Sequence, residues 1–216
     1  MTDIKAEADR LVADGVRSMT IERKESAAGA VLTISHVYPT GLDDLWDAIV
    51  DQQRLARWFG NVAGDFRVGG TYEVEGNATG TILTCNAPNG FSATWDFGGG
   101  TSDIRVRLAP EGDGTRLTLE HAADVPYEFY DVFGPGATGV GWDQGLLGLA
   151  AYLALDTSAP VETTEWAASV DGLAFIRATA AAWGDAAIAA GETEESARAS
   201  AARTADFFSG ASEPQV

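Results

Sequence analysis

Between Gly141 and Leu155 the chain reads GWDQGLLGLAAYLAL. Trp142, Leu146 and Leu149 recur at helical spacing and mark one apolar face of this segment. A helix with so apolar a face is poorly soluble by itself, so we expect it to pack against another apolar layer. The sequence before it predicts that this layer is a β-sheet.

Short runs of alternating apolar and polar residues fill the stretch from Gly64 to Ala122, and glycine-rich turns separate them. FSATWDF (Phe91–Phe97) is one such run, with Trp95 and Phe97 on its apolar side. Alternation of this kind predicts antiparallel strands with one face toward the core and one toward water. The regular turns predict that successive strands form a meander.

The N-terminal part of the chain predicts a helix followed by a hairpin. Residues 2–13 carry apolar side chains at helical spacing, and Gly15 ends that helix. The hairpin pairs a strand over residues 16–23 with one over residues 31–38, and its turn falls at residues 27–30.

A second helical region follows Pro39. Thr40 and Asp43 have the spacing of a capping box, which predicts a helix that begins there and carries Trp46 on its apolar face. A short helical piece over residues 52–59 comes next. After the long helix, the chain becomes alanine-rich and helical in pattern. We therefore divide it into a domain over residues 1–160 and a helical extension over residues 161–216, which packs on the domain or on a second subunit.

Composition limits the classes of partner. The chain carries 32 acidic and 14 basic side chains, a net charge of −18. Nucleic acids and anionic membrane surfaces are recognised by Lys and Arg, so neither is expected as a partner. No signal peptide and no apolar run of about eighteen residues is recognisable. With a single cysteine, Cys85, the chain fits a reducing compartment, and we expect a soluble cytoplasmic protein.

Several segments together resemble a known superfamily. In chain order they are LWDAIVDQQRLARWFG (Leu45–Gly60), FRVGGTYEV (Phe66–Val74), FSATWDF (Phe91–Phe97), GTRLTLEH (Gly114–His121) and GWDQGLLGLAAYL (Gly141–Leu153). The set is similar to the START-like superfamily, also called SRPBCC or helix-grip proteins. Within it, the chain resembles the branch named for the activator of the heat-shock-protein-ninety ATPase. The resemblance covers residues 30–155 and leaves the C-terminal extension unexplained.

The resemblance implies an α+β fold. In helix-grip proteins, a curved seven-stranded antiparallel sheet wraps around a long C-terminal helix, with a cavity between them. Members bind sterols, lipids, polyketides or plant hormones, and some branches are cyclases or components of hydroxylases. The branch name also points to a chaperone as a partner.

Large apolar side chains dominate the candidate site. Each one alone is explained by core packing, because aromatic residues stabilise any domain of this size. As a group they favour an apolar cavity that holds a small molecule. The predicted ligand-binding residues are Trp46, Trp58, Phe59, Tyr72, Trp95, Phe97, His121, Trp142, Leu146 and Leu149. Among them, Trp58 and Phe59 are the first choice for the cavity mouth.

Few residues suggest catalysis. His36 and His121 share strand parity with apolar neighbours, and a buried histidine most often has a structural role. His121 is the better candidate for proton transfer or for a hydrogen bond to a ligand carbonyl. No metal-ligand spacing accompanies either histidine, so no metal and no cofactor is expected. Cys85 has no basic neighbour in sequence and is interpreted as a small buried apolar residue.

These observations support one leading hypothesis and two alternatives. The leading one is an intracellular binding protein for a small hydrophobic or aromatic ligand held in the cavity between the sheet and the long helix. The first alternative is a polyketide cyclase or hydrolase that uses the same cavity, with His121 and a tyrosine as its acid–base pair. The second is a chaperone-linked interaction protein. A homodimer through the helical extension is a further prediction.

Overall fold

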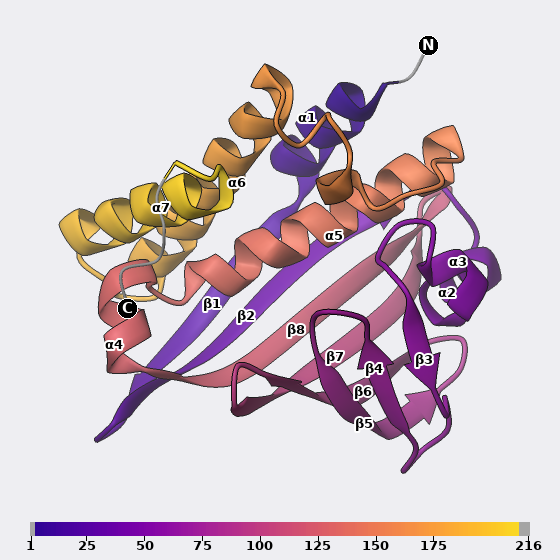
Figure 1. Cartoon of the computed structure of the whole chain (residues 1–216), viewed down its shortest axis with the longest axis horizontal. Helices are drawn as coiled ribbons and strands as arrows, with labels where there is room; N and C mark the ends of the chain where they lie inside the picture. Colours follow the sequence, from indigo (N-terminus) through magenta and orange to yellow (C-terminus); the bar gives the residue numbers. More distant parts are fainter. Residues whose placement is uncertain (1–2, 212–216) are drawn as a thin grey trace.

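An eight-stranded antiparallel sheet curves around helix α5 (Gly136–Leu155) in the computed structural model, which describes residues 3–211 (Figure 1). The strand order is β1-β2-β8-β7-β6-β5-β4-β3. The strands are β1 (Val16–Arg23), β2 (Ala27–Tyr38), β3 (Val62–Gly64), β4 (Thr71–Val74), β5 (Thr79–Asn86), β6 (Gly90–Phe97), β7 (Gly100–Glu111) and β8 (Gly114–Pro126). The predicted α+β helix-grip fold is confirmed, with eight strands where the resemblance implied seven.

Helices cover one face of this sheet. Besides α5, the helices are α1 (Ile4–Asp14), α2 (Leu42–Val50), α3 (Gln52–Leu55), α4 (Tyr127–Phe133), α6 (Val170–Ala189) and α7 (Glu194–Phe208), with a 3-10 turn η1 (Val161–Thr163). In Figure 1, α5 lies across the inner face of the sheet, and α1, α6 and α7 lie on the far side of α5. None of the helices in residues 3–211 is both long and apolar enough to cross a membrane.

Four predicted boundaries differ from those of the structure. The long helix begins at Gly136 rather than Gly141. The hairpin turn falls at residues 24–26, because Ala28 and Ala30 are small buried residues that continue β2 and pair with β8. The short helix α3 ends at Leu55, and hydrogen-bonded turns continue to residue 59. The N-terminal helix begins at Ile4, and residue 2 lies outside the described part of the chain.

The predicted capping box at Thr40 does not form. The residue that precedes α2 is Gly41, and no side chain caps that helix end. Thr40 therefore lies one position before the cap of α2. Its backbone carbonyl accepts a hydrogen bond from Thr115 Oγ1 (2.9 Å) on β8. Its hydroxyl instead donates to Asp44 (2.6 Å) on the first turn of α2.

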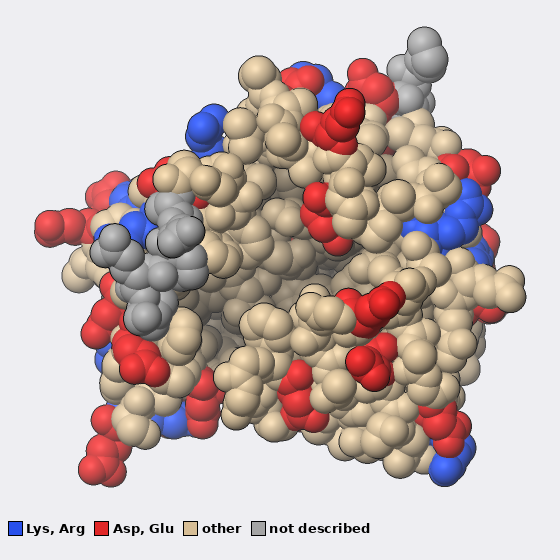
Figure 2. All heavy atoms as spheres, viewed as in Figure 1, with Lys and Arg blue, Asp and Glu red and all other residues tan. Residues whose placement is uncertain are grey.

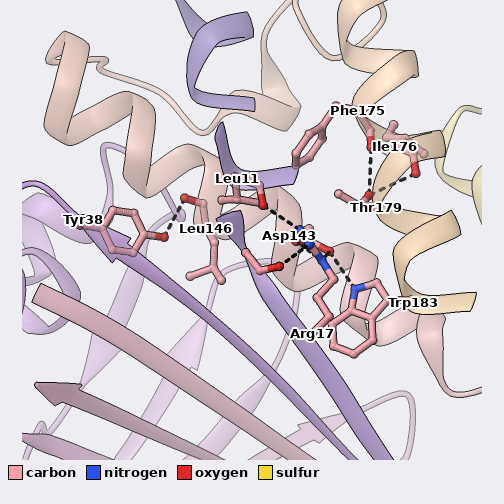
Figure 3. Close-up of polar contacts among 10 residues, drawn as sticks. Leu11, Arg17, Tyr38, Asp143, Leu146, Phe175, Ile176, Thr179 and Trp183 are labelled. Carbon is pink, nitrogen blue, oxygen red and sulfur yellow. Dashed lines mark hydrogen bonds and ion pairs between the residues drawn. The ribbon is translucent and has the colours of Figure 1, made fainter. Parts of the chain in front are cut away.

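A buried ion pair fixes α5 from behind. Arg17 on β1 donates to both carboxylate oxygens of Asp143, at 2.6 Å for the shortest contact, and both side chains are almost completely buried (Figure 3). Trp183 on α6 donates its indole N–H to Asp143 Oδ2 at 2.8 Å. Burial raises the pKa of Asp143, and the donors from Arg17 and Trp183 oppose that rise. One carboxylate therefore joins β1, α5 and α6.

The C-terminal extension packs on the same chain. Helix α6 contacts α1, α5 and β1, and α7 contacts α4, α5 and α6. A glycine makes the tightest part of this packing feasible, because a Cβ on Gly139 would lie 2.2 Å from the indole of Trp183. The homodimer predicted for this segment stays a prediction.

Candidate functional site

A cavity of about 360 Å³ lies between the inner face of the sheet, the α2–α3 region and α5. This volume falls within the roughly 300–1,000 Å³ range of small-molecule sites. Strands β3 to β8 form its floor, and the Trp142–Leu146 turn of α5 forms its roof. Figure 2 shows a hollow on the face viewed, between α5 and the strands below it, and the side chains nearest to it are uncharged or acidic.

Three aromatic rings form the centre of the wall. Phe59 lies parallel to Trp142, with ring centroids 6.1 Å apart and planes 4° apart. Trp95 on β6 lies 5.1 Å from Trp142 and 6.4 Å from Phe59. All three rings are only half-buried, so they present part of their faces to the cavity. Such surfaces suit flat apolar molecules, because aromatic pairs stack at these separations.

Two further aromatic residues line the cavity and use their polar atoms elsewhere. Tyr72 donates its hydroxyl to the carbonyl of Thr94 at 2.6 Å, and burial raises the pKa of Tyr72 to about 12. Trp58 donates its indole N–H to the carbonyl of Ala48 at 2.9 Å, at the end of α2. Both polar groups are therefore satisfied within the protein, and mainly apolar ring surface faces the cavity.

His121 lies behind the wall in a directed chain of hydrogen bonds. The indole N–H of Trp142 can only donate, and it lies 2.8 Å from His121 Nδ1, so that nitrogen carries no proton. The proton is then on Nε2, which donates to Ser102 Oγ at 2.8 Å. Ser102 in turn donates to the carbonyl of Trp95 at 2.9 Å. Burial lowers the pKa of His121 to about 4, so the ring is neutral near pH 7.

Most of the predicted site residues come together, and three do not. The residues that line the cavity are Trp46, Trp58, Phe59, Tyr72, Trp95, Trp142 and Leu146. Phe97 does not, because it lies at the end of β6 beside the hairpin turn and is 60% exposed. His121 is covered by its hydrogen-bond partners, and Leu149 is fully buried in the main core.

Residues that were not predicted complete the lining. They are Ile49, Val50, Leu55, Val62, Phe66, Val74, Ile82, Cys85, Phe91, Ile104, Val106, Leu117, Leu119 and Gly145. The strand members share the apolar parity of their runs, which was the available signal. Cys85 is exposed and lines the cavity, so its interpretation as a buried residue is wrong. Gly145 is a bare position on α5 opposite Phe59, and its lack of a side chain leaves room.

His121 forms its hydrogen bonds with Trp142 and Ser102 rather than with a tyrosine. Both ring nitrogens of His121 are engaged, and within residues 3–211 no tyrosine hydroxyl hydrogen bonds to it. Tyr72 donates to a backbone carbonyl, as described above. The same part of the chain contains no group of three or more His, Cys, Asp or Glu side chains that could hold a metal ion. The predicted acid–base pair is therefore not assembled.

Comparison with solved structures identifies similar proteins. The crystal structure of CalU16 from Micromonospora echinospora is 31% identical, covers 66% of this chain and 87% of its own, and has a TM-score of 0.56. The solution NMR structure of CalU16 is 28% identical, with coverages of 82% and 96% and a TM-score of 0.63. DynU16, described as a protein of the dynemicin biosynthetic locus, is 20% identical (59% and 48% covered, TM-score 0.51), which shows the fold alone.

A comparison with curated proteins found no match. A family model described as "Activator of Hsp90 ATPase homolog 1-like protein" matches residues 39–154, which is more than half of the chain. The matched segment runs from the start of the α2 region to the end of α5 and contains every residue that lines the cavity. The chain therefore belongs to the family of activator of Hsp90 ATPase homologue 1-like proteins, within the SRPBCC superfamily.

Proposed function

We propose that the protein binds a small apolar or aromatic molecule in the cavity between α5 and the sheet. The observation that carries this proposal is the lining itself: 21 residues surround about 360 Å³, and none of them is charged. Exposed apolar surface of this kind gains free energy when a ligand replaces water, at roughly 25 cal/mol per Å². Concave, mainly apolar pockets with few polar groups are the usual form of small-molecule sites.

The wall is also organised in advance of binding. The hydrogen bonds of Trp142, Tyr72 and Trp58 fix three of the lining rings through their polar edges. A ligand therefore meets side chains whose rotamers are already restricted, and it loses less free energy to side-chain ordering. This arrangement supports binding, because the polar atoms of these three rings are already hydrogen-bonded within the protein and leave mainly apolar ring surface to the ligand.

A neutral fluorescent probe tests the proposal. N-phenylnaphthylamine becomes brighter in apolar surroundings and accepts energy from tryptophan, so it should report entry beside Trp95 and Trp142. We expect saturable binding with one site per chain. An absence of saturable binding, by fluorescence and by calorimetry, would contradict the proposal.

Gly145 offers a matched pair of variants for the same experiment. A Cβ at this position would meet Phe59 at an ordinary contact distance of 3.6 Å, so Gly145→Ala should bind the probe nearly as well as the native chain. Gly145→Leu places a branched side chain into the cavity and should abolish binding while the protein stays folded in thermal unfolding. Equal probe binding by the Leu and Ala variants would show that the probe binds elsewhere.

A further inference from the structure

The lining of the cavity offers no positive charge to an anionic ligand. Its lining includes no Lys, Arg or His side chain. The hydroxyl of Tyr72 and the indole N–H groups of Trp58 and Trp142 already donate to protein acceptors, which leaves the neutral indole N–H groups of Trp46 and Trp95 and the thiol of Cys85 as side-chain donors of the lining. An anionic group that entered would therefore lose water and meet at most these few neutral donors, without a cationic partner, which is unfavourable.

Most basic side chains of the chain lie beside a carboxylate. Twelve of the fourteen Lys and Arg side chains form an ion pair with a carboxylate of the same chain. Arg67, next to the lining residue Phe66, is one of them and pairs with Asp65 at 2.6 Å. The other two, Arg177 and Arg203, lie on α6 and α7, on the far side of α5 from the sheet.

The surface charge of the protein also disfavours anionic ligands. With a net charge of −18, the protein repels anions before they reach the cavity. From these observations we infer that the natural ligand is an uncharged, ring-containing molecule, and that the site rejects carboxylates, sulfonates and phosphates of the same shape. Free fatty acids, phospholipids and phosphorylated carriers are excluded by this selectivity. The inference rests on the proposed function and narrows it to one class of ligand.

Two probes that differ by one charged group test the selectivity. N-phenylnaphthylamine and anilinonaphthalene sulfonate share a ring system, and only the second carries a sulfonate. We expect the neutral probe to bind more tightly by at least about tenfold, because even partial desolvation of an anion without a cationic partner lowers its affinity by that factor. Equal or tighter binding of the sulfonate would overturn the inference while the proposed function stands. If neither probe binds, the proposed function fails and the inference fails with it.

An engineered charge provides the converse test. Cys85 is exposed and lines the cavity, so Cys85→Lys places an ammonium group at its mouth without burying it. The readout is the ratio of the two affinities: in this variant the sulfonate should gain roughly fivefold relative to the neutral probe. Leu83→Lys is the matched control, because Leu83 is exposed on the same strand but does not line the cavity. An equal gain with both variants would indicate only a general surface-charge effect and would contradict the inference.

Discussion

The indole N–H of Trp142 on α5 donates to Nδ1 of His121 on β8 over 2.8 Å, and this contact joins the roof of the cavity to its floor. Because an indole cannot accept a hydrogen bond, the contact allows only one neutral tautomer of His121. A proton on Nδ1 would remove the acceptor and turn the contact into a repulsion between two N–H groups. The position of one cavity wall thus depends on the protonation of a buried histidine.

This dependence predicts that stability falls in mild acid. The pKa of His121 is lowered from 6.5 to about 4 in the folded protein, so between these values the unfolded chain binds a proton that the folded chain does not. The contribution of His121 is complete above the unfolded value and is lost progressively as the pH falls toward 4. Urea unfolding should give about 2 kcal/mol less stability from this group at about pH 5 than at about pH 7.

A glutamine at the same position separates this effect from that of other groups. His121→Gln can still accept from Trp142 and donate to Ser102, but it does not titrate. The variant should therefore lose stability less steeply over the same pH window. Burial lowers the pKa of His36 as well, so some slope of the same sign should remain. Identical slopes for the variant and the native protein would contradict the assignment.

Two glycines of α5 should respond in opposite ways to the same substitution. Gly145→Ala should stabilise the protein by about 1 kcal/mol, because alanine is the better helix former and the new methyl group finds space. At Gly148 a Cβ would lie 2.5 Å from the carbonyl oxygen of Trp58, so Gly148→Ala should destabilise by about 1–3 kcal/mol. Chemical unfolding of both variants measures the difference, and equal effects would show that the cavity does not reach Gly145.

Replacing one partner of the buried ion pair should destabilise the protein more than replacing both partners. Arg17→Met leaves the carboxylate of Asp143 buried without its charged partner and should destabilise by about 3–5 kcal/mol. Adding Asp143→Asn removes the charge and keeps an acceptor for Trp183, so the double variant should recover a large part of that loss. The exposed pair of Lys5 and Asp9 is the control, and Asp9→Asn should change stability by less than about 1 kcal/mol.

The single thiol predicts a simple labelling result. Cys85 is exposed in the folded protein, so a maleimide should modify it without denaturant, as mass spectrometry can measure. Bound N-phenylnaphthylamine should slow the modification, because the thiol lies at the edge of the occupied cavity. A thiol that reacts only after unfolding would contradict this description of the cavity mouth.

The sheet and the long helix were predictable because their signals are local. Apolar alternation placed Trp95 on the inner face of β6, and helical spacing placed Trp142 and Leu146 on the face of α5 that meets it. These are the residues at the centre of the cavity. Periodicity identifies a face, and in this fold the two faces that meet create the site.

Three predicted site residues do not line the cavity, because periodicity does not show where a strand ends or which part of a helix faces the cavity. Phe97 shares the parity of Trp95 but lies at the hairpin turn, where it is largely exposed. Leu149 shares the stripe of Leu146 but lies one turn further along α5, where the packing is closed. His121 alternates with the inward-facing residues of β8, but Trp142 of α5 covers it, so it does not line the cavity.

The ion pair behind α5 also has a consequence for the order of events during synthesis. Arg17 is made 126 positions before Asp143, and Trp183 follows 40 positions later still. The guanidinium group of Arg17 has no carboxylate partner until Asp143 has left the ribosome, and it lacks the helix that carries Trp183 until that later segment follows. Helix α1 and strand β1 therefore reach their final packing only after α6, far later in the sequence, has been made.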